Sequence, residues 1–467
     1  MTTEYDVIII GAGAVAENVA DRAVQGGLTA VLIESELVGG ECSYWACMPS
    51  KALLRSGIAL RAAQNVEGAK QAVTGGLDVE AVLRRRTSFT HDWDDSSQVD
   101  WVNGTGIDLV RGHGRLTGVR TVAVEKDGQL THLSARHAVV VSTGSDPVLP
   151  DIPGLADSRP WTPREATSAT AIPKRLAIIG GGVVAVELAT AYASFGCAVT
   201  VIARSGLLTN QEDFAAELVG AALGKFGVTV IEGSPTAVGR DGAVTITVDG
   251  TTVVADEVLV ATGRQPRTTD IGLDTVGIEP GDWLHVDDTL LVAGTDWLYA
   301  TGDVNHRALL THQGKYQARA AGDVIAARAT GKPVDAAPWG THAATADHAA
   351  VPQVTFSDPE VASVGLTSMA AAKAGYDIRV VDYDLGWVAG ASLQADGYEG
   401  RARMVVDEKR GVILGVTFVG QDVSELIHAA TIAIVGEVPI SRLWHAVPAY
   451  PTMNEIWLRL LEGYGRP

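Results

Sequence analysis

Cys42 and Cys47 are the residues whose type and spacing most directly suggest chemistry in this chain of 467 residues. The chain has three cysteines, and this small, odd number does not suit the disulfide framework of a secreted domain. A structural zinc site takes about four ligands, more than these cysteines provide. Four intervening residues in a distorted helical turn allow two sulfurs to reach bonding distance, and a thiolate near a helix start is acidified. We therefore expect a redox pair and no metal site; the alternative is two buried, unpaired cysteines. Cys197, just before a strand, is expected to belong to a core.

Two glycine-rich turns are the elements that must position this chemistry. The first, residues 11–16, follows an apolar strand, and the next strand ends at Glu34, where a carboxylate binds the ribose of a dinucleotide. The second, residues 180–185, has the same strand, turn and helix context. One such turn is weak evidence, but two in this context predict two nucleotide sites in one chain.

Charge and hydropathy exclude some classes of partner. The formal net charge is -19 and no basic run is present, so we expect no nucleic acid. No apolar run approaches membrane-spanning length, and a strand begins within six residues of Met1, so we expect no membrane partner and a cytoplasmic location.

The segment 39–51, Gly-Gly-Glu-Cys-Ser-Tyr-Trp-Ala-Cys-Met-Pro-Ser-Lys, resembles the pyridine nucleotide-disulfide oxidoreductases, among them dihydrolipoamide dehydrogenase, glutathione reductase and mercuric reductase. The resemblance covers essentially the whole chain, including glycine turns at residues 142–147, 261–266 and 300–303. After about residue 345 the sequence pattern changes to one typical of a separate α+β domain. It implies an α/β fold with two Rossmann-like three-layer nucleotide-binding domains and a C-terminal α+β dimerisation domain. The predicted ranges are 1–150 and 276–345 for the two parts of the FAD-binding domain, 151–275 for the NAD(P)-binding domain and 346–467 for the interface domain.

The same resemblance implies roles for single residues. Cys47 would touch the flavin of FAD and Cys42 would exchange with substrate, while Lys51 and Glu187 match a pair beside the flavin N5, where a cation stabilises the negative charge of reduced flavin. Cofactor-binding residues are expected at Gly11, Gly13, Ala16, Glu34, Gly40, Lys51, Thr143, Gly144, Gly180, Gly182, Glu187, Arg204, Gly263, Arg264 and Asp303.

The second nucleotide site favours NADPH over NADH. NADH enzymes place an acid at the end of the second strand, and here that position is Ala203, followed by Arg204 and Ser205. The absent acid and the added cation suit a 2'-phosphate, as in mercuric reductases; the alternative is that Arg204 points to solvent.

The chain also departs from the family pattern. A terminal His-Pro-Thr-x-x-Glu becomes Tyr450-Pro-Thr-Met-Asn-Glu455, and tyrosine, with a pKa of about 10, suits acid-base work near neutrality poorly. His445 is a possible substitute, although a structural role is favoured. The C-terminal cysteine pair of mercuric reductases is absent, so mercury reduction is not expected. Glu41 stands where the family often has a threonine. Tyr44 and Trp45 either restrict access to Cys42 or are ordinary packing residues.

We therefore predict a homodimeric FAD enzyme that passes hydride from NADPH to the Cys42-Cys47 disulfide and on to a small-molecule disulfide, with Tyr450 and Glu455 contributing at the interface. The alternatives are a quinone or other acceptor reductase working directly from the flavin, and an inactive nucleotide-binding dimer.

Overall fold

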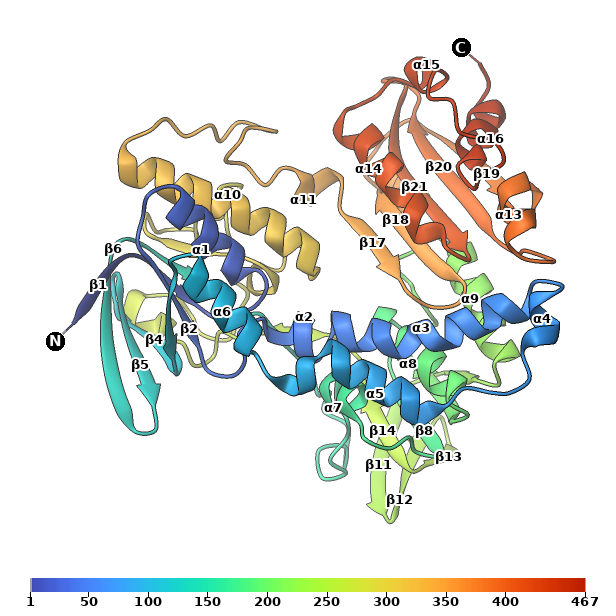
Figure 1. The fold of residues 1–467 in the computed structure, drawn as a ribbon, viewed down its shortest axis with the longest axis horizontal. Coiled ribbons are helices and arrows are strands. Elements are labelled where there is room, and N and C mark those ends of the chain that lie inside the picture. Colours follow the sequence, from blue (N-terminus) through green and yellow to red (C-terminus); the bar gives the residue numbers. More distant parts are fainter. Residues whose placement is uncertain (1, 467) are drawn as a thin grey trace. The chain divides into compact units, whose positions relative to one another are not determined.

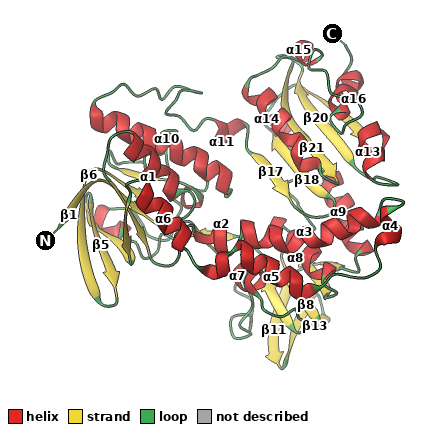
Figure 2. Ribbon diagram, in the orientation of Figure 1, coloured by secondary structure: helices red, strands yellow, loops and turns green. Residues whose placement is uncertain are grey.

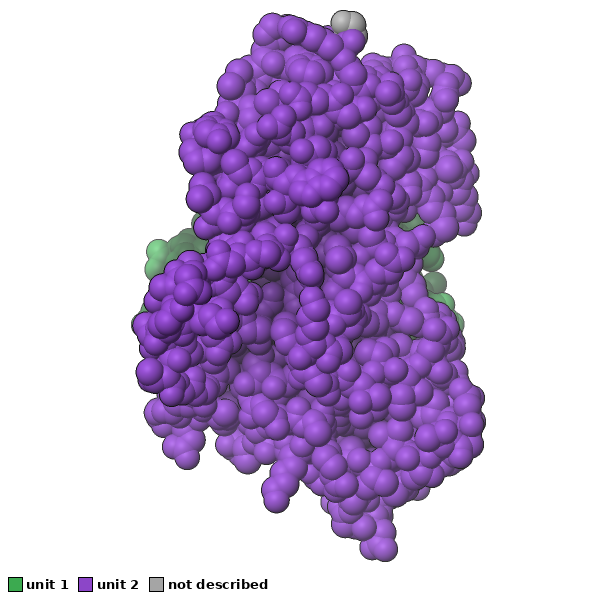
Figure 3. All heavy atoms as spheres, turned by 90° about the vertical axis from the view of Figure 1, so that its right-hand side faces the viewer, with its two compact units in different colours: residues 1–49, 87–148, 263–347 green, residues 50–86, 149–262, 348–467 purple. Residues whose placement is uncertain are grey.

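The computed structural model describes residues 2–466, and the chain divides into two compact units (Figure 3). Unit 1 comprises residues 1–49, 87–148 and 263–347, and unit 2 comprises residues 50–86, 149–262 and 348–467. Three of the five boundaries fall inside α3 (Cys47–Gln64), α5 (Val79–Phe89) and α11 (Ala346–Ala349).

A seven-stranded sheet forms the centre of unit 1 (Figures 1 and 2). Its order is β3-β2-β1-β6-β5-β4, and β16 pairs with the end of β6; β3, β2, β1, β6 and β16 pair in parallel, whereas β6, β5 and β4 pair antiparallel. The strands are β1 (Thr3–Ile10), β2 (Ala30–Glu34), β3 (Asp108–Arg111), β4 (His113–Gly118), β5 (Thr121–Lys126), β6 (Gln129–Val141) and β16 (Leu298–Ala300).

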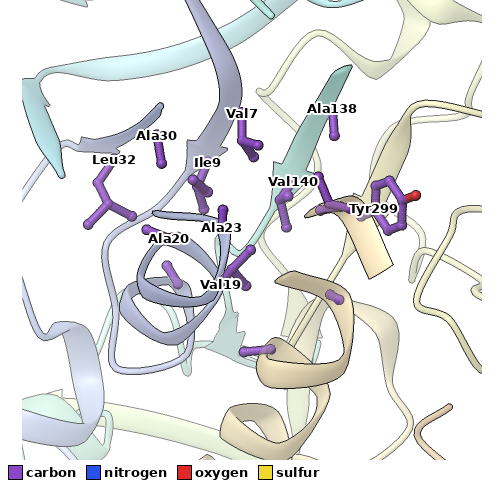
Figure 4. Packing of buried hydrophobic residues seen from close by; sticks show 14 of the residues in the cluster. Val7, Ile9, Val19, Ala20, Ala23, Ala30, Leu32, Ala138, Val140 and Tyr299 are labelled. Carbon is purple, nitrogen blue, oxygen red and sulfur yellow. The ribbon is translucent and has the colours of Figure 1, made fainter. Parts of the chain in front are cut away.

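Alternate side chains of β1 enter two different cores, because successive residues of a strand point to opposite faces. Val7 and Ile9 pack with α1 (Ala16–Gln25) and α10 (Thr311–Thr330), as Figure 4 shows for part of this cluster. Ile8 lies in the core on the other face. Burial on both faces explains why β1 is a continuous apolar run.

Helices α1 and α10 are in close contact and run parallel. A Cβ on Gly314 would lie 2.6 Å from Val15 Cγ2, and a Cβ on Gly322 would lie 2.6 Å from Arg22 Cβ. These contacts advance together along both helices, which defines the parallel direction, and Arg22 Nη2 pairs with Asp323 Oδ1 at 2.7 Å. Glycine thus allows the two backbones to approach.

Unit 2 contains a four-stranded parallel sheet, β10-β9-β8-β14, and a three-stranded antiparallel sheet, β11-β12-β13. Apolar residues of α8 (Val183–Ser194) and α9 (Asp213–Lys225) share a core with β8 and β9, and buried Cys197 belongs to it, as expected. The strands are β8 (Arg175–Ile179), β9 (Ala198–Ala203), β10 (Thr229–Glu232), β11 (Pro235–Asp241), β12 (Ala243–Val248), β13 (Thr251–Ala255) and β14 (Glu257–Val260).

The C-terminal part of unit 2 is an antiparallel sheet of order β17-β18-β21-β20-β19, with α14 (Ile427–Val435) and α16 (Glu455–Tyr464) packed on it. Its strands are β17 (Pro352–Thr355), β18 (Glu360–Gly365), β19 (Ile378–Asp384), β20 (Arg401–Asp407) and β21 (Val412–Gly420). The mixed sheet of unit 1 and the parallel sheet of unit 2, together with this antiparallel C-terminal sheet, confirm the predicted fold class. Within residues 2–466, no helix combines the length and apolarity needed to cross a membrane.

Candidate functional site

A cavity of about 400 Å³ in unit 1 opens where parallel strands β1 and β2 end. Such volumes suit small ligands and cofactors, whose pockets run from about 300 to 1,000 Å³. The structure brings most of the predicted flavin-site residues together here. Those lining the cavity are Gly11, Gly13, Glu34, Gly40, Cys42, Thr143, Gly144, Arg264 and Asp303.

Bare backbone forms one wall of this cavity. Gly11 has φ +104°, and a Cβ there would lie 2.4 Å from the carbonyl oxygen of Ser142, so only glycine fits. A Cβ on Gly40 would lie 2.9 Å from the Cα of Gly13. Ala16, also predicted to bind cofactor, is fully buried beneath the turn and does not line the cavity. The turn therefore presents amide groups at the start of α1 to whatever binds.

Glu34 lies at the end of β2, where the glycine turn holds its carboxylate. Oε2 accepts a hydrogen bond from the amide of Ala12 at 2.8 Å, and Oε1 accepts from the amide of Glu36 at 2.8 Å. Burial raises the pKa of Glu34 above its usual value, while these two amides act in the opposite direction. The side chain is thus fixed in one orientation at the cavity edge.

Asp303 is far from Glu34 in the sequence but lines the same cavity. The hydroxyl of Ser145 donates to Asp303 Oδ2 at 2.5 Å, and Arg264 Nε lies 3.7 Å from the same oxygen. Burial raises the pKa of Asp303. Ser145 and Arg264 belong to two short paired strands, β7 (Ser145–Pro147) and β15 (Arg264–Pro266), and Gly263, with φ +145°, immediately precedes β15.

Cys42 and Cys47 lie at a break between two helices: Cys42 is in α2 (Gly40–Tyr44), and Cys47 is the first residue of α3. Both cysteines are half-buried and carry no disulfide. Cys47 Sγ lies 3.4 Å from Thr311 Oγ1, at the start of α10. The pKa of the Cys42 thiol is raised, first by its hydrogen bond with Cys47, then by burial and by the Cys47 charge, whereas Thr311 and Lys315 lower it. The sequence interpretation did not include Thr311, whose position depends on packing of a distant helix.

The two aromatics between the cysteines have different environments. Tyr44 is 1% exposed, its hydroxyl donates to the carbonyl of Asp94 at 3.5 Å, and burial raises its pKa to about 12. The neighbouring Trp45 is half-buried, with its ring centroid 5.7 Å from that of Tyr44. Tyr44 is therefore a core residue.

In unit 2, Lys51 and Glu187 form the expected pair. Lys51 Nζ lies 2.8 Å from Glu187 Oε2, and Glu187 Oε1 accepts a hydrogen bond from the amide of Phe356 at 2.9 Å. The ammonium also lies 4.8 Å from the centroid of the Phe356 ring. The sequence interpretation missed Phe356, because nothing near it in the chain marks a partner 169 residues away.

The second glycine turn closes tightly on the strand ends of unit 2. A Cβ on Gly180 (φ +136°) would lie 2.2 Å from the carbonyl oxygen of Ala261, and one on Gly181 would lie 2.2 Å from that of Gly206. Gly182 is the N-cap of α8, with open space where a side chain would be. Arg204 is exposed just after β9.

Comparison with known proteins agrees with this architecture. Residues 5–323 match the family model described as pyridine nucleotide-disulphide oxidoreductase, and residues 351–460 match its dimerisation domain. The chain belongs to the pyridine nucleotide-disulphide oxidoreductase family. It is an FAD-dependent enzyme of this family, whose members use NAD(P)H.

Individual relatives cover nearly the whole chain. A mercuric reductase of Shigella flexneri is 32% identical over 462 residues, which are 96% of this chain and 79% of that protein. A dihydrolipoyl dehydrogenase of Halobacterium salinarum is 30% identical over 483 residues, covering 99% and 96%. The Cu(II) complex of the HOCl-induced flavoprotein disulfide reductase RclA from Escherichia coli has the same fold, with a TM-score of 0.85, 22% identity and 99% coverage of both chains.

The region around Tyr450 is where the chain departs from the family pattern. The Tyr450 side chain is 76% exposed, and His445 is exposed as well. Glu455 is 6% exposed; its Oε1 pairs with Arg459 at 2.5 Å, while its buried Oε2 has no hydrogen-bond partner among residues 2–466. Over the same residues, no cluster of three or more His, Cys, Asp or Glu side chains could hold a metal ion.

Proposed function

We propose that this enzyme passes hydride from NADPH to FAD, and electrons from FAD through the Cys42-Cys47 disulfide to a small-molecule disulfide. The observation that carries the proposal is the position of Cys42, which lines the cavity of unit 1 while its thiol is hydrogen-bonded to Cys47. A thiol at the cavity wall, with a second thiol hydrogen-bonded to it, is suited to receive electrons from a cofactor bound there.

The residues present fit FAD. The side-chain-free wall at Gly11, Gly13 and Gly40 and the amides at the start of α1 suit a pyrophosphate, and the fixed carboxylate of Glu34 suits a ribose. Asp303 offers a further acceptor for the hydroxyl groups of the flavin chain. When bound, FAD supplies hydride acceptance from the nicotinamide and delivery of two electrons to the disulfide.

The cysteine pair then performs thiol–disulfide exchange. The Cys42 thiolate attacks one sulfur of the acceptor disulfide, forming a mixed disulfide and releasing one thiol after protonation. The Cys47 thiolate next attacks Cys42 Sγ, restoring the Cys42-Cys47 disulfide and releasing the second thiol. In the reduced state the hydroxyl of Thr311 and the thiol of Cys42 are placed to stabilise a Cys47 thiolate.

For the nucleotide, we propose a preference for NADPH. Ala203 ends β9 without a carboxylate, and the exposed Arg204 beside it is free to reach a 2'-phosphate. We assign Lys51 and Glu187 to the hydride-transfer step, in which the ammonium would stabilise negative charge on a flavin bound nearby.

We also propose a cytoplasmic homodimer, supported by the match to the dimerisation domain. The exposed side chain of Tyr450 is available to a second subunit and would take the place of the family's proton-donating histidine. Glu455, anchored by Arg459, would position this segment.

Anaerobic titration of the purified protein with NADPH tests the proposal. Uptake of about two hydride equivalents, with a long-wavelength absorbance band from thiolate next to flavin, is expected. Uptake of one equivalent that only bleaches the flavin would favour the second candidate, a quinone reductase acting directly from the flavin. Cys42→Ser separates the two again: it should abolish turnover of disulfides, whereas the quinone reaction would survive, and Cys197→Ser is the matched control.

A further inference from the structure

Glu41, the residue directly before Cys42, binds two arginines at the cavity wall. Its Oε2 lies 2.6 Å from Arg264 Nη2, and its Oε1 lies 3.1 Å from Arg267 Nη2. All three side chains line the cavity. One carboxylate therefore ties two guanidinium groups to the segment that carries the reactive thiol.

Each arginine also has a second partner. Arg264 donates from Nε to Ser145 Oγ and from Nη2 to the carbonyl of Ser145, both at 2.6 Å, and Ser145 in turn donates to Asp303. Arg267 donates from Nε to Asp146 Oδ1 at 2.6 Å. With this many contacts, both guanidinium groups have fixed positions, and Glu41 is the acceptor that they share.

Glu41 is the carboxylate that both guanidinium groups share, whereas Asp303 faces only Arg264 and Asp146 faces only Arg267. The side chains of Glu41 and Arg264 are only 22% and 23% exposed, so solvent screens their charges incompletely. A neutral residue at position 41 would remove one negative charge from the cavity wall.

We propose that Glu41 is a positioning residue that holds Arg264 and Arg267 and lowers the midpoint potential of the bound flavin by withholding their positive charge from the cavity. The inference rests on the proposed FAD site. Reduced flavin carries more negative charge than oxidised flavin, so an extra carboxylate disfavours reduction. A lower flavin potential increases the driving force for electron transfer onward to the Cys42-Cys47 disulfide.

The test measures the flavin midpoint potential of FAD-loaded protein against a reference dye for the wild type and three variants. Glu41→Gln keeps the shape and removes the charge, and the potential should become more positive. Arg267→Gln should shift it in the opposite direction. The double variant Glu41→Gln/Arg267→Gln has the same net charge as the wild type, so its potential should return towards the wild-type value.

Asp270→Asn is the matched control, because Asp270 also lines the cavity but pairs with Arg115 at 2.7 Å instead of with the two arginines. An equal shift in Asp270→Asn, an unchanged potential in Glu41→Gln, or a double variant that does not return would overturn the proposal. If Glu41→Gln does not fold, Glu41→Thr and the single variant Arg267→Gln should still shift the midpoint potential in opposite directions. Wild-type protein that binds no FAD would instead refute the proposed function.

Discussion

Lys51 and Glu187 form an ion pair in which the carboxylate is buried and both of its oxygens have a partner. Lys51 Nζ lies 2.8 Å from Oε2, and the amide of Phe356 lies 2.9 Å from Oε1. The side chain of Glu187 is only 5% exposed, whereas that of Lys51 is 36% exposed. The glutamate is therefore the fixed partner, and it determines where the ammonium lies.

Replacing Glu187 should impair the reductive step. Glu187→Gln keeps the acceptor for the Phe356 amide but removes the charge that holds Lys51, and displacement of a catalytic group by about 1 Å costs up to roughly 100-fold in rate. Stopped-flow reduction of the flavin by NADPH measures the change. Glu212→Gln is the control, because Glu212 is a buried glutamate of the same unit that pairs with Arg403 at 2.9 Å. An equal loss in both variants would mean that Glu187 is only structural.

Alkylation of Cys42 in the reduced protein should depend on Cys47. The raised pKa of Cys42 results mainly from its hydrogen bond with Cys47, so its thiol should react slowly at neutral pH and faster as the pH rises. In Cys47→Ser a hydroxyl that stays neutral replaces the ionisable thiol of Cys47, so the pH profile should move to lower pH. Iodoacetamide labelling across a pH series, with peptide mapping, follows the rate. A profile that is the same in both proteins would contradict this account.

Glu17 should make the protein less stable as the pH rises. Its Oε1 is buried without a hydrogen-bond partner among residues 2–466, and burial raises its pKa from 4.5 to about 7, against the opposing charge of Lys315. Below pH 4.5 the group is protonated in both the folded and the unfolded chain and contributes nothing. Between pH 4.5 and 7 only the unfolded chain ionises, so about 3 kcal/mol of stability is lost and does not return above pH 7.

The variant Glu17→Gln should remove this loss. Relative to the wild type it should be more stable at pH 8 and gain little at pH 4, as measured by urea unfolding of FAD-saturated protein. A gain of equal size at both pH values would show that ionisation of Glu17 is not the cause.

A carboxylate at position 203 should reverse the nucleotide preference. In Ala203→Glu the new charge would repel a 2'-phosphate and accept from ribose hydroxyls, so kcat/KM for NADPH should fall by about tenfold or more while that for NADH rises. Ala203→Gln is the matched neutral control. If both variants lose activity with both nucleotides alike, bulk at this buried position, and not charge, is responsible.

Local patterns predicted the fold well because each depends on neighbouring residues. Strands followed by glycine turns could be recognised from apolar runs and from positions such as Gly11 and Gly180, where positive φ and close carbonyls exclude a side chain. The Lys51-Glu187 pair was reached through resemblance. The partners of Glu41 could not be predicted, because Arg264 and Arg267 lie 223 and 226 residues away. The position of Glu41 in α2 can be predicted locally, but spacing along the chain does not identify the cations that pair with it.

Two parallel helices in contact place like ends of their dipoles together, an arrangement that is unfavourable unless an anion lies at the shared positive end. α1 and α10 are such a pair: Val15 and Thr311, at their starts, both line the cavity. An anionic cofactor there acts as an electrostatic tie between the first turns of the two helices. Protein stripped of its cofactor should therefore lose hydrogen-exchange protection first in those turns, before the sheet beneath them opens.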